Sequence, residues 1–194
     1  MTKKISITGI VTGVLYFISV GVFLITQSEI ALTIWELMTV ISAPVVMFVV
    51  LQLCDLVSDE AIYKKAALAF MSCTCALTSI AHIVNITVTR PFMSKGVDVP
   101  TYFQIGYWPS VEMAIDYSAW GFFTGLAFLC IGLATKNKNK LFQRIKATSL
   151  ICGSLCLVGF FGTIFINENI WYTAPFGYGF GTIILCLQMF RLEN

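Results

Sequence analysis

Charge is what this sequence has least of. Only 11% of its 194 residues are charged, less than half of the roughly 25% usual in soluble domains. Apolar residues make up 58% of the chain, and its mean hydropathy is +0.86. These values exclude a water-soluble globule and a disordered chain. The twelve basic and ten acidic residues leave a net charge of +2, so we expect no nucleic-acid partner.

Metal-binding patterns are scarce as well. The chain has one histidine, His82, whereas a catalytic zinc ion is normally held by three protein ligands and a water molecule. The seven cysteines fall within or at the ends of apolar stretches, which is typical of buried space-filling thiols and indicates no disulfide framework. We therefore expect no cofactor and no bound metal, and we assign no catalytic residue.

Long intervals without charged residues predict membrane-spanning helices. A helix needs about 20 residues to cross ~30 Å of hydrocarbon, and each charge-free interval holds one such span. Exposed strands are excluded because their edges cannot be satisfied in lipid. The sequence therefore predicts one all-α integral membrane domain, 1–194. Its six helices are expected near residues 5–27, 34–55, 63–89, 110–135, 146–166 and 170–190.

The basic residues predict how these helices are oriented. Of the twelve lysines and arginines, Arg90 and Lys95 fall on one side of the predicted membrane, and the other ten fall on the opposite side. Because basic residues collect in cytoplasmic loops, we expect both termini in the cytoplasm and residues 90–109 outside.

Glycines spaced four apart predict close helix packing. Gly121 and Gly125 share a face of the fourth span, and Gly177 and Gly181 share a face of the sixth. These faces would serve contacts within one chain or between two copies in a homodimer. The sequence favours neither arrangement. Besides lipid, a small ligand is the other partner that we consider.

Six polar residues near the predicted outer ends of the spans need an explanation, because burying ionisable groups in lipid costs at least ~2.5 kcal/mol each. Two have a structural account. Thr33-Ile-Trp-Glu36 resembles a capping box at the start of the second span, and Glu112 would complement the dipole in the first turn of the fourth. The six candidates for ligand binding or proton relay are Glu36, His82, Asn85, Arg90, Glu112 and Asp116.

His82 and Asp116 are the deepest of these groups. We place each about 10 Å from the outer surface, taking the third span to end before Arg90-Pro91. Because an isolated buried charge is costly, we predict that His82 and Asp116 contact each other, directly or through one water molecule. Such a pair would respond to external pH. In the alternative, Asp116 pairs with Arg90, and His82 bonds to Ser79 or to a neighbouring helix.

Three functions remain open. The pattern favours small-ligand or proton-linked binding or transport through an outward-facing polar pocket. An intramembrane metal-dependent hydrolase would use the same histidine and carboxylates. A structural or partner-binding membrane subunit would instead use the polar groups at separate helix interfaces.

Several stretches carry a resemblance to a known group of proteins. These are Ile34-Trp-Glu-Leu-Met-Thr39, Thr78 to Pro91, Trp108-Pro-Ser-Val-Glu112, and Asp116 with Ala119-Trp-Gly-Phe-Phe123. They resemble small, uncharacterised multispanning proteins of the bacterial inner membrane. The resemblance implies the same topology and location. It implies no activity, because none is assigned to that group.

Overall fold

The structure is a computed structural model that describes residues 2–57, 61–136 and 138–192. Within these ranges the chain forms helices and the connections between them, without strands. Six helical segments are long and apolar enough to cross a membrane. They confirm the predicted all-α architecture and are Thr2–Thr26, Glu29–Val57, Ala61–Ser94, Val111–Ala134, Lys140–Phe165 and Glu168–Leu192.

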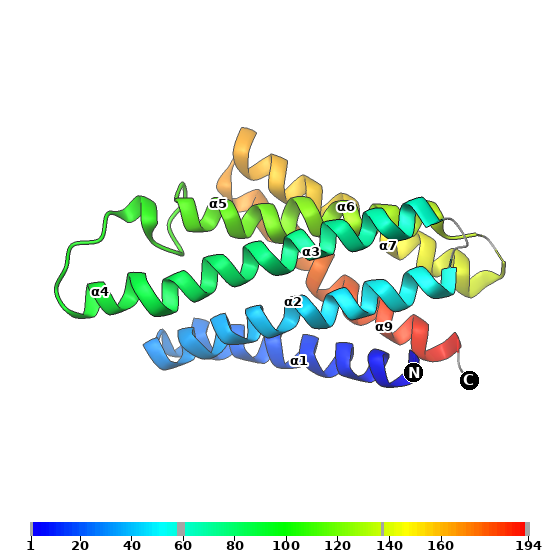
Figure 1. The fold of residues 1–194 in the computed structure, drawn as a ribbon, viewed down its shortest axis with the longest axis horizontal. Helices are drawn as coiled ribbons and strands as arrows, with labels where there is room; N and C mark the ends of the chain where they lie inside the picture. The colour runs from blue at the N-terminus through cyan, green and yellow to red at the C-terminus, as the bar shows by residue number, and fades with distance from the viewer. Residues whose placement is uncertain (1, 58–60, 137, 193–194) are drawn as a thin grey trace.

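The six segments run up and down along a common direction (Figure 1). Both termini lie at one end, which we call the termini end, and residues 95–110 form a long connection at the other, the loop end. The first two segments are single α-helices, α1 (Thr2–Thr26) and α2 (Glu29–Val57). The third joins three elements: α3 (Ala61–Val84), η1 (Asn85–Thr89) and α4 (Arg90–Ser94).

The second half of the chain repeats this mixture of helix types. A short 3-10 turn, η2 (Thr101–Phe103), lies in the loop-end connection. The fourth segment joins α5 (Val111–Tyr117), η3 (Ser118–Phe123) and α6 (Thr124–Ala134), and α7 (Lys140–Phe165) forms the fifth. The sixth joins η4 (Glu168–Tyr172), α8 (Thr173–Pro175), η5 (Phe176–Phe180) and α9 (Gly181–Leu192).

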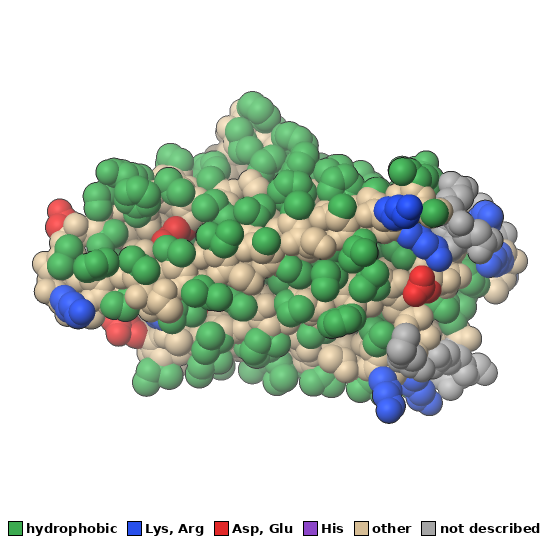
Figure 2. All heavy atoms as spheres, in the orientation of Figure 1, with side chains coloured by type: hydrophobic (Ala, Val, Ile, Leu, Met, Phe, Trp, Pro, Cys, Tyr) green, Lys and Arg blue, Asp and Glu red, His purple; other side chains and the backbone are tan. Residues whose placement is uncertain are grey.

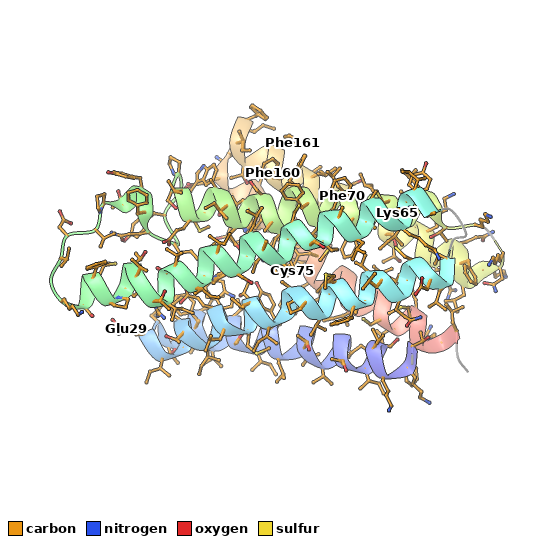
Figure 3. All side chains as sticks on the ribbon, in the orientation of Figure 1. Glu29, Lys65, Phe70, Cys75, Phe160 and Phe161 are labelled. Atoms are coloured by element: carbon orange, nitrogen blue, oxygen red, sulfur yellow. The ribbon has the colours of Figure 1, made fainter. Side chains whose placement is uncertain are left out.

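The surface matches a membrane environment. Charged side chains gather at the two ends of the molecule, and apolar side chains cover much of the band between them (Figure 2). Glu29 and Lys65 mark opposite ends, whereas Phe160 and Phe161 belong to α7 (Figure 3). Phe161 is 43% exposed. Large apolar side chains facing outward along the whole bundle are expected where the surrounding solvent is lipid.

The interior is divided along its length. The half nearer the termini end is an apolar core in which Val49, Leu53, Met71, Phe128 and Leu185 are fully buried. The buried polar side chains toward the loop end include Glu36, His82, Asn85 and Glu112. This division places the candidate site to one side of the bundle centre and separates it from the termini end by packed apolar side chains.

The third span is longer than predicted. We expected it to end before Pro91, but the helix continues to Ser94. The reason is the π-helical turn η1, in which the Arg90 N–H bonds to the carbonyl of Asn85 five residues back. The wider turn leaves room for the proline ring, which would clash in an ordinary α-helix. Roughly 18 Å of helix therefore separates His82 from Ser94.

The predicted capping box is also wrong. The second span begins at Glu29, and the hydroxyl oxygen of Ser28 accepts the N–H of Ala31 at 3.2 Å, as an N-cap does. Glu36 is therefore two turns inside the helix and only 1% exposed. The account of Glu112 holds, because α5 begins at Val111 and Ser110 caps it through the Met113 N–H.

The glycine faces are used inside the chain. A Cβ built on Gly125 would lie 3.1 Å from the carbonyl oxygen of Gly153 in α7, and one on Gly177 would lie 2.6 Å from that of Cys152. These glycines let α6 and η5 approach α7 backbone to backbone. Homodimer formation stays a prediction, and we assign none of these glycine contacts to a dimer interface.

Gly177→Ala tests this packing. We expect it to lower the free energy of unfolding by about 1–3 kcal/mol, because the added methyl group meets a backbone carbonyl that cannot move aside. Gly21→Ala is the matched control, since nothing lies within 4 Å of a Cβ at that position. Unfolding in mixed detergent micelles measures both variants. Equal stability of the two would contradict the packing described here.

The predicted orientation is tested by reporter fusions after residues 100 and 138. Residue 100 lies in the loop-end connection and residue 138 at the termini end. We expect an extracytoplasmic reporter to be active at residue 100 and a cytoplasmic reporter at residue 138, because ten of the twelve basic residues lie on the side of residue 138. The reverse pattern would overturn the orientation.

Candidate functional site: a buried histidine between carboxylates

Three spans supply the candidate site, and each contributes near its loop end. Glu36 lies on α2, His82 on α3, and Asp116 on α5. Polar residues on the same face of the third span, Thr78, Asn85 and Thr89, are buried with His82. Helical spacing explains this, because residues three or four apart share one face.

His82 lies between two carboxylates from different helices. Its Nε2 is 3.3 Å from Oδ1 of Asp116, and its Nδ1 is 3.7 Å from Oε1 of Glu36. The predicted contact between His82 and Asp116 is thus confirmed. Neither nitrogen has the alignment of a hydrogen bond, so these are close electrostatic contacts. The His82 side chain is 5% exposed, that of Glu36 1% and that of Asp116 15%.

Arg90 and Asn85 complete the surroundings of Glu36. The Arg90 guanidinium nitrogen Nη2 is 3.2 Å from Oε2 of Glu36 and donates to the Thr33 hydroxyl at 2.8 Å. The Asn85 side-chain amide donates to Oε1 of Glu36. The alternative pairing of Asp116 with Arg90 is therefore wrong. The reason is the π-turn at η1, which carries Arg90 toward α2, where its stem reaches Glu36.

Glu112 lies beside this group with a partner of its own. Its Oε1 accepts the hydroxyl of Thr89 at 2.8 Å, and its residue is 5% exposed. The backbone of Ile105 also lies against the Glu112 carboxylate, so the loop-end connection covers it. All six predicted residues are therefore close together. They form one closed cluster in which Glu112 is a neighbour of the histidine site and not one of its direct contacts.

Aromatic rings stack on Tyr117, the last residue of α5 and the next residue after Asp116. Tyr117 stacks on Trp171 with ring centroids 3.7 Å apart and on Trp108 at 5.1 Å. Trp108 belongs to the loop-end connection and Trp171 to η4. The stack therefore joins three separate segments. Sequence reasoning missed it because stacking between distant segments leaves no periodic pattern.

The cluster is poor in hydrogen bonds for its burial. Buried atoms without such a partner include both ring nitrogens of His82, Oδ1 of Asp116 and Oε2 of Glu112. Buried polar groups are satisfied in most proteins, so a group of unsatisfied ones marks a functional site or bound water. Among the groups in direct contact, Glu36 and Asp116 offset Arg90 and a protonated His82, whereas the neighbouring Glu112 adds one further negative charge when it is ionised.

The arrangement does not resemble a metal centre. Among the residues that the structure describes, no three His, Cys, Asp or Glu side chains are placed to hold a metal ion. Arg90 already occupies one oxygen of Glu36, and a guanidinium cation there would repel a metal ion. The residues therefore give a hydrolytic metal site little geometric support.

No protein-family model matches the chain, and no curated protein or solved structure is significantly similar to it. The fold and the site together define a class of protein. The chain has the architecture of a multi-pass membrane protein, with a buried histidine–carboxylate cluster among its helices. Membership in the bacterial group that the sequence resembles stays a prediction.

A double-mutant cycle tests the Glu36–Arg90 ion pair. We expect Glu36→Gln and Arg90→Gln each to destabilise the protein, because each leaves the other charge buried without its partner. The double variant should lose less than the sum of the two, with a coupling of about 1–3 kcal/mol. Unfolding in mixed micelles measures it. Strictly additive effects would show that the two side chains do not depend on each other.

Proposed function

We propose that this protein binds protons at the His82 cluster and links that binding to a small ligand, as a proton-linked binding protein or transporter. The observation that carries the proposal is the position of one imidazole between Glu36 and Asp116, which come from two other helices. Histidine is the side chain whose charge ordinarily changes near neutral pH.

The electrostatics explain why a proton would matter here. Without a proton on His82, the ionised carboxylates of Glu36 and Asp116 face one positive charge, that of Arg90, so at least one negative charge remains inside an apolar bundle, and the neighbouring Glu112 adds to it when ionised. An uncompensated buried charge is costly, and a proton or another small cation removes that cost. Proton binding therefore also changes how strongly α2, α3 and α5 are held together, which is the link to ligand binding that a transporter needs.

The position of the cluster supports entry from the loop end. All three contributing helices place their residues near that end, and the apolar core lies on the other side. If the predicted orientation holds, protons and ligand reach the cluster from outside the cell. The outer aromatic stack of Trp108, Tyr117 and Trp171 would have to move for a larger ligand to enter.

Proton uptake by sealed vesicles tests the proposal. Vesicles containing the protein and an internal pH dye, with a membrane potential applied, should acidify faster than empty vesicles. His82→Gln and Asp116→Asn should abolish the difference, because each removes one of the two ionisable groups in the contact between His82 and Asp116. Asp55→Asn is the matched control, since Asp55 is an exposed carboxylate paired with Lys64 elsewhere.

Two outcomes would count against this function. Acidification equal to that of empty vesicles would show that the protein does not transport protons. Full acidification by both His82→Gln and Asp116→Asn would show that the cluster takes no part in proton transport. Stoichiometric zinc in the purified protein would instead favour the hydrolase alternative, with the same residues as ligands.

A further inference from the structure

The loop-end connection, residues 95–110, contacts the bundle over a short stretch. It curves from α4 back to α5 (Figure 1), and most of its residues are exposed. The 3-10 turn η2 within it packs against α5. Apart from its last residue, which caps α5, the partly buried residues are Val99, Gln104, Ile105 and Trp108. Connections of this length are uncommon in compact domains unless they serve a function.

A polar contact holds this connection to the candidate site. The backbone N–H of Ile105 interacts with the Glu112 carboxylate, which also accepts the hydroxyl of Thr89 at 2.8 Å. Glu112 therefore ties the connection to the third span, one helical turn from Asp116. Oε2 of Glu112 has no aligned hydrogen-bond partner, so the Ile105 contact is a loose electrostatic one.

An aromatic contact holds the end of the connection. Trp108 stacks on Tyr117 with ring centroids 5.1 Å apart, and Tyr117 stacks on Trp171 of the sixth span. Tyr117 is 7% exposed and follows Asp116 directly. Both the polar and the aromatic contact are therefore made by α5, the helix that carries Asp116 to the histidine.

The part of the connection between α4 and these contacts is held together by a hydrogen bond of its own. The Gln104 side-chain amide donates to the carbonyl of Val99, which closes the segment around η2 into one unit. A glycine with left-handed backbone lies at each end of this unit, Gly96 with φ +75° and Gly106 with φ +89°. Nothing lies within 4 Å of a Cβ built at either glycine. Residues 97–105 can therefore turn about the two glycines as one piece.

We infer that residues 97–105 are a lid over the loop end of the His82 cluster and that Glu112 is the latch that keeps it closed. The lid turns about the two glycines. When it opens, Ile105 leaves Glu112, and the carboxylate becomes accessible from the loop end. This lid is the segment that an entering ligand displaces, and that role rests on the proposed function. The latch itself requires no transport.

A carboxylate suits this latch because the open lid offers it a second partner. Opening the lid removes the contact of Ile105 with Glu112, but it also admits water, which solvates the charge. The loss of one contact is thus offset by the gain of another, and the closed lid is favoured only modestly. A lid that must open and close during ligand entry needs such a balance.

Hydrogen–deuterium exchange in detergent micelles, read amide by amide in NMR spectra, tests the latch. We expect Glu112→Gln to speed exchange of the Ile105 amide about fivefold, the effect of one ordinary hydrogen bond on an opening equilibrium. The substitution keeps the shape of the side chain and removes the charge that the amide faces. Glu29→Gln is the matched control, because Glu29 is an exposed carboxylate at the same end of the bundle (Figure 3).

Trp108→Leu tests the aromatic contact. It removes the stack on Tyr117 and leaves Glu112 in place, so we expect the Ile105 amide to exchange faster in this variant too. The double variant with Glu112→Gln should exchange faster than either single one. The amide of Met71, in the apolar core, reports whether the bundle stays folded and should keep its wild-type rate throughout.

The outcomes separate the lid from the proposed function. An Ile105 rate that equals that of Glu29→Gln in both Glu112→Gln and Trp108→Leu would overturn the lid, and vesicle acidification could still support the function. Exchange needs no proton gradient, so vesicles that fail to acidify would leave the latch result unchanged.

A second variant covers the case in which Glu112→Gln also speeds exchange at Met71 and has therefore opened the bundle. Thr89→Val keeps the charge of Glu112 but removes the hydroxyl that holds it to the third span. We expect it to speed exchange at Ile105 while Met71 keeps its wild-type rate. A wild-type rate at Ile105 in this variant would overturn the latch.

Discussion

Ionised side chains inside an apolar helix bundle must be neutralised by partners from other helices, and this constraint shapes the protein. Glu36 and Asp116 lie on two different spans, and His82 and Arg90 on a third bring the opposite charge to them. Lipid offers these groups no alternative partner. The cluster therefore joins three spans near the loop end, while the rest of the bundle is held by apolar packing, glycine contacts and a few hydrogen bonds between helices, such as that between the Thr74 and Thr124 hydroxyls.

The π-helical turns make this arrangement compatible with continuous spans. The turn at Asn85–Thr89 carries the third helix past Pro91 and directs Arg90 toward Glu36. The turns at Ser118–Phe123 and Phe176–Phe180 contribute Trp120 and Tyr178, whose ring centroids lie 4.7 Å apart. Single π-turns inside α-helices often mark functional sites. Here the first of them contributes Asn85 and Thr89 to the cluster, and the second begins two residues after Asp116.

The sequence predicted much of the fold and part of the site. Charge-free intervals predicted all six spans, because insertion into hydrocarbon depends on composition and length alone. The contact of His82 with Asp116 followed from depth and the cost of isolated charge, and it is confirmed. The capping role of Glu36 was wrong because the second helix begins at Glu29, and Glu36 inside it pairs with Arg90, which is distant in sequence. The aromatic stack depends on side-to-side helix packing, which periodicity does not encode.

His82 lies between the carboxylates of two helices. Because it is the single histidine of the chain, its ring nitrogens can be observed directly. Protein labelled with ¹⁵N at histidine has two ring-nitrogen signals in NMR spectra, both from His82. We expect Asp116→Asn to shift chiefly the Nε2 signal and Glu36→Gln to shift chiefly the Nδ1 signal, since each nitrogen faces one carboxylate. Ring-nitrogen signals that stay unchanged in both variants would contradict it.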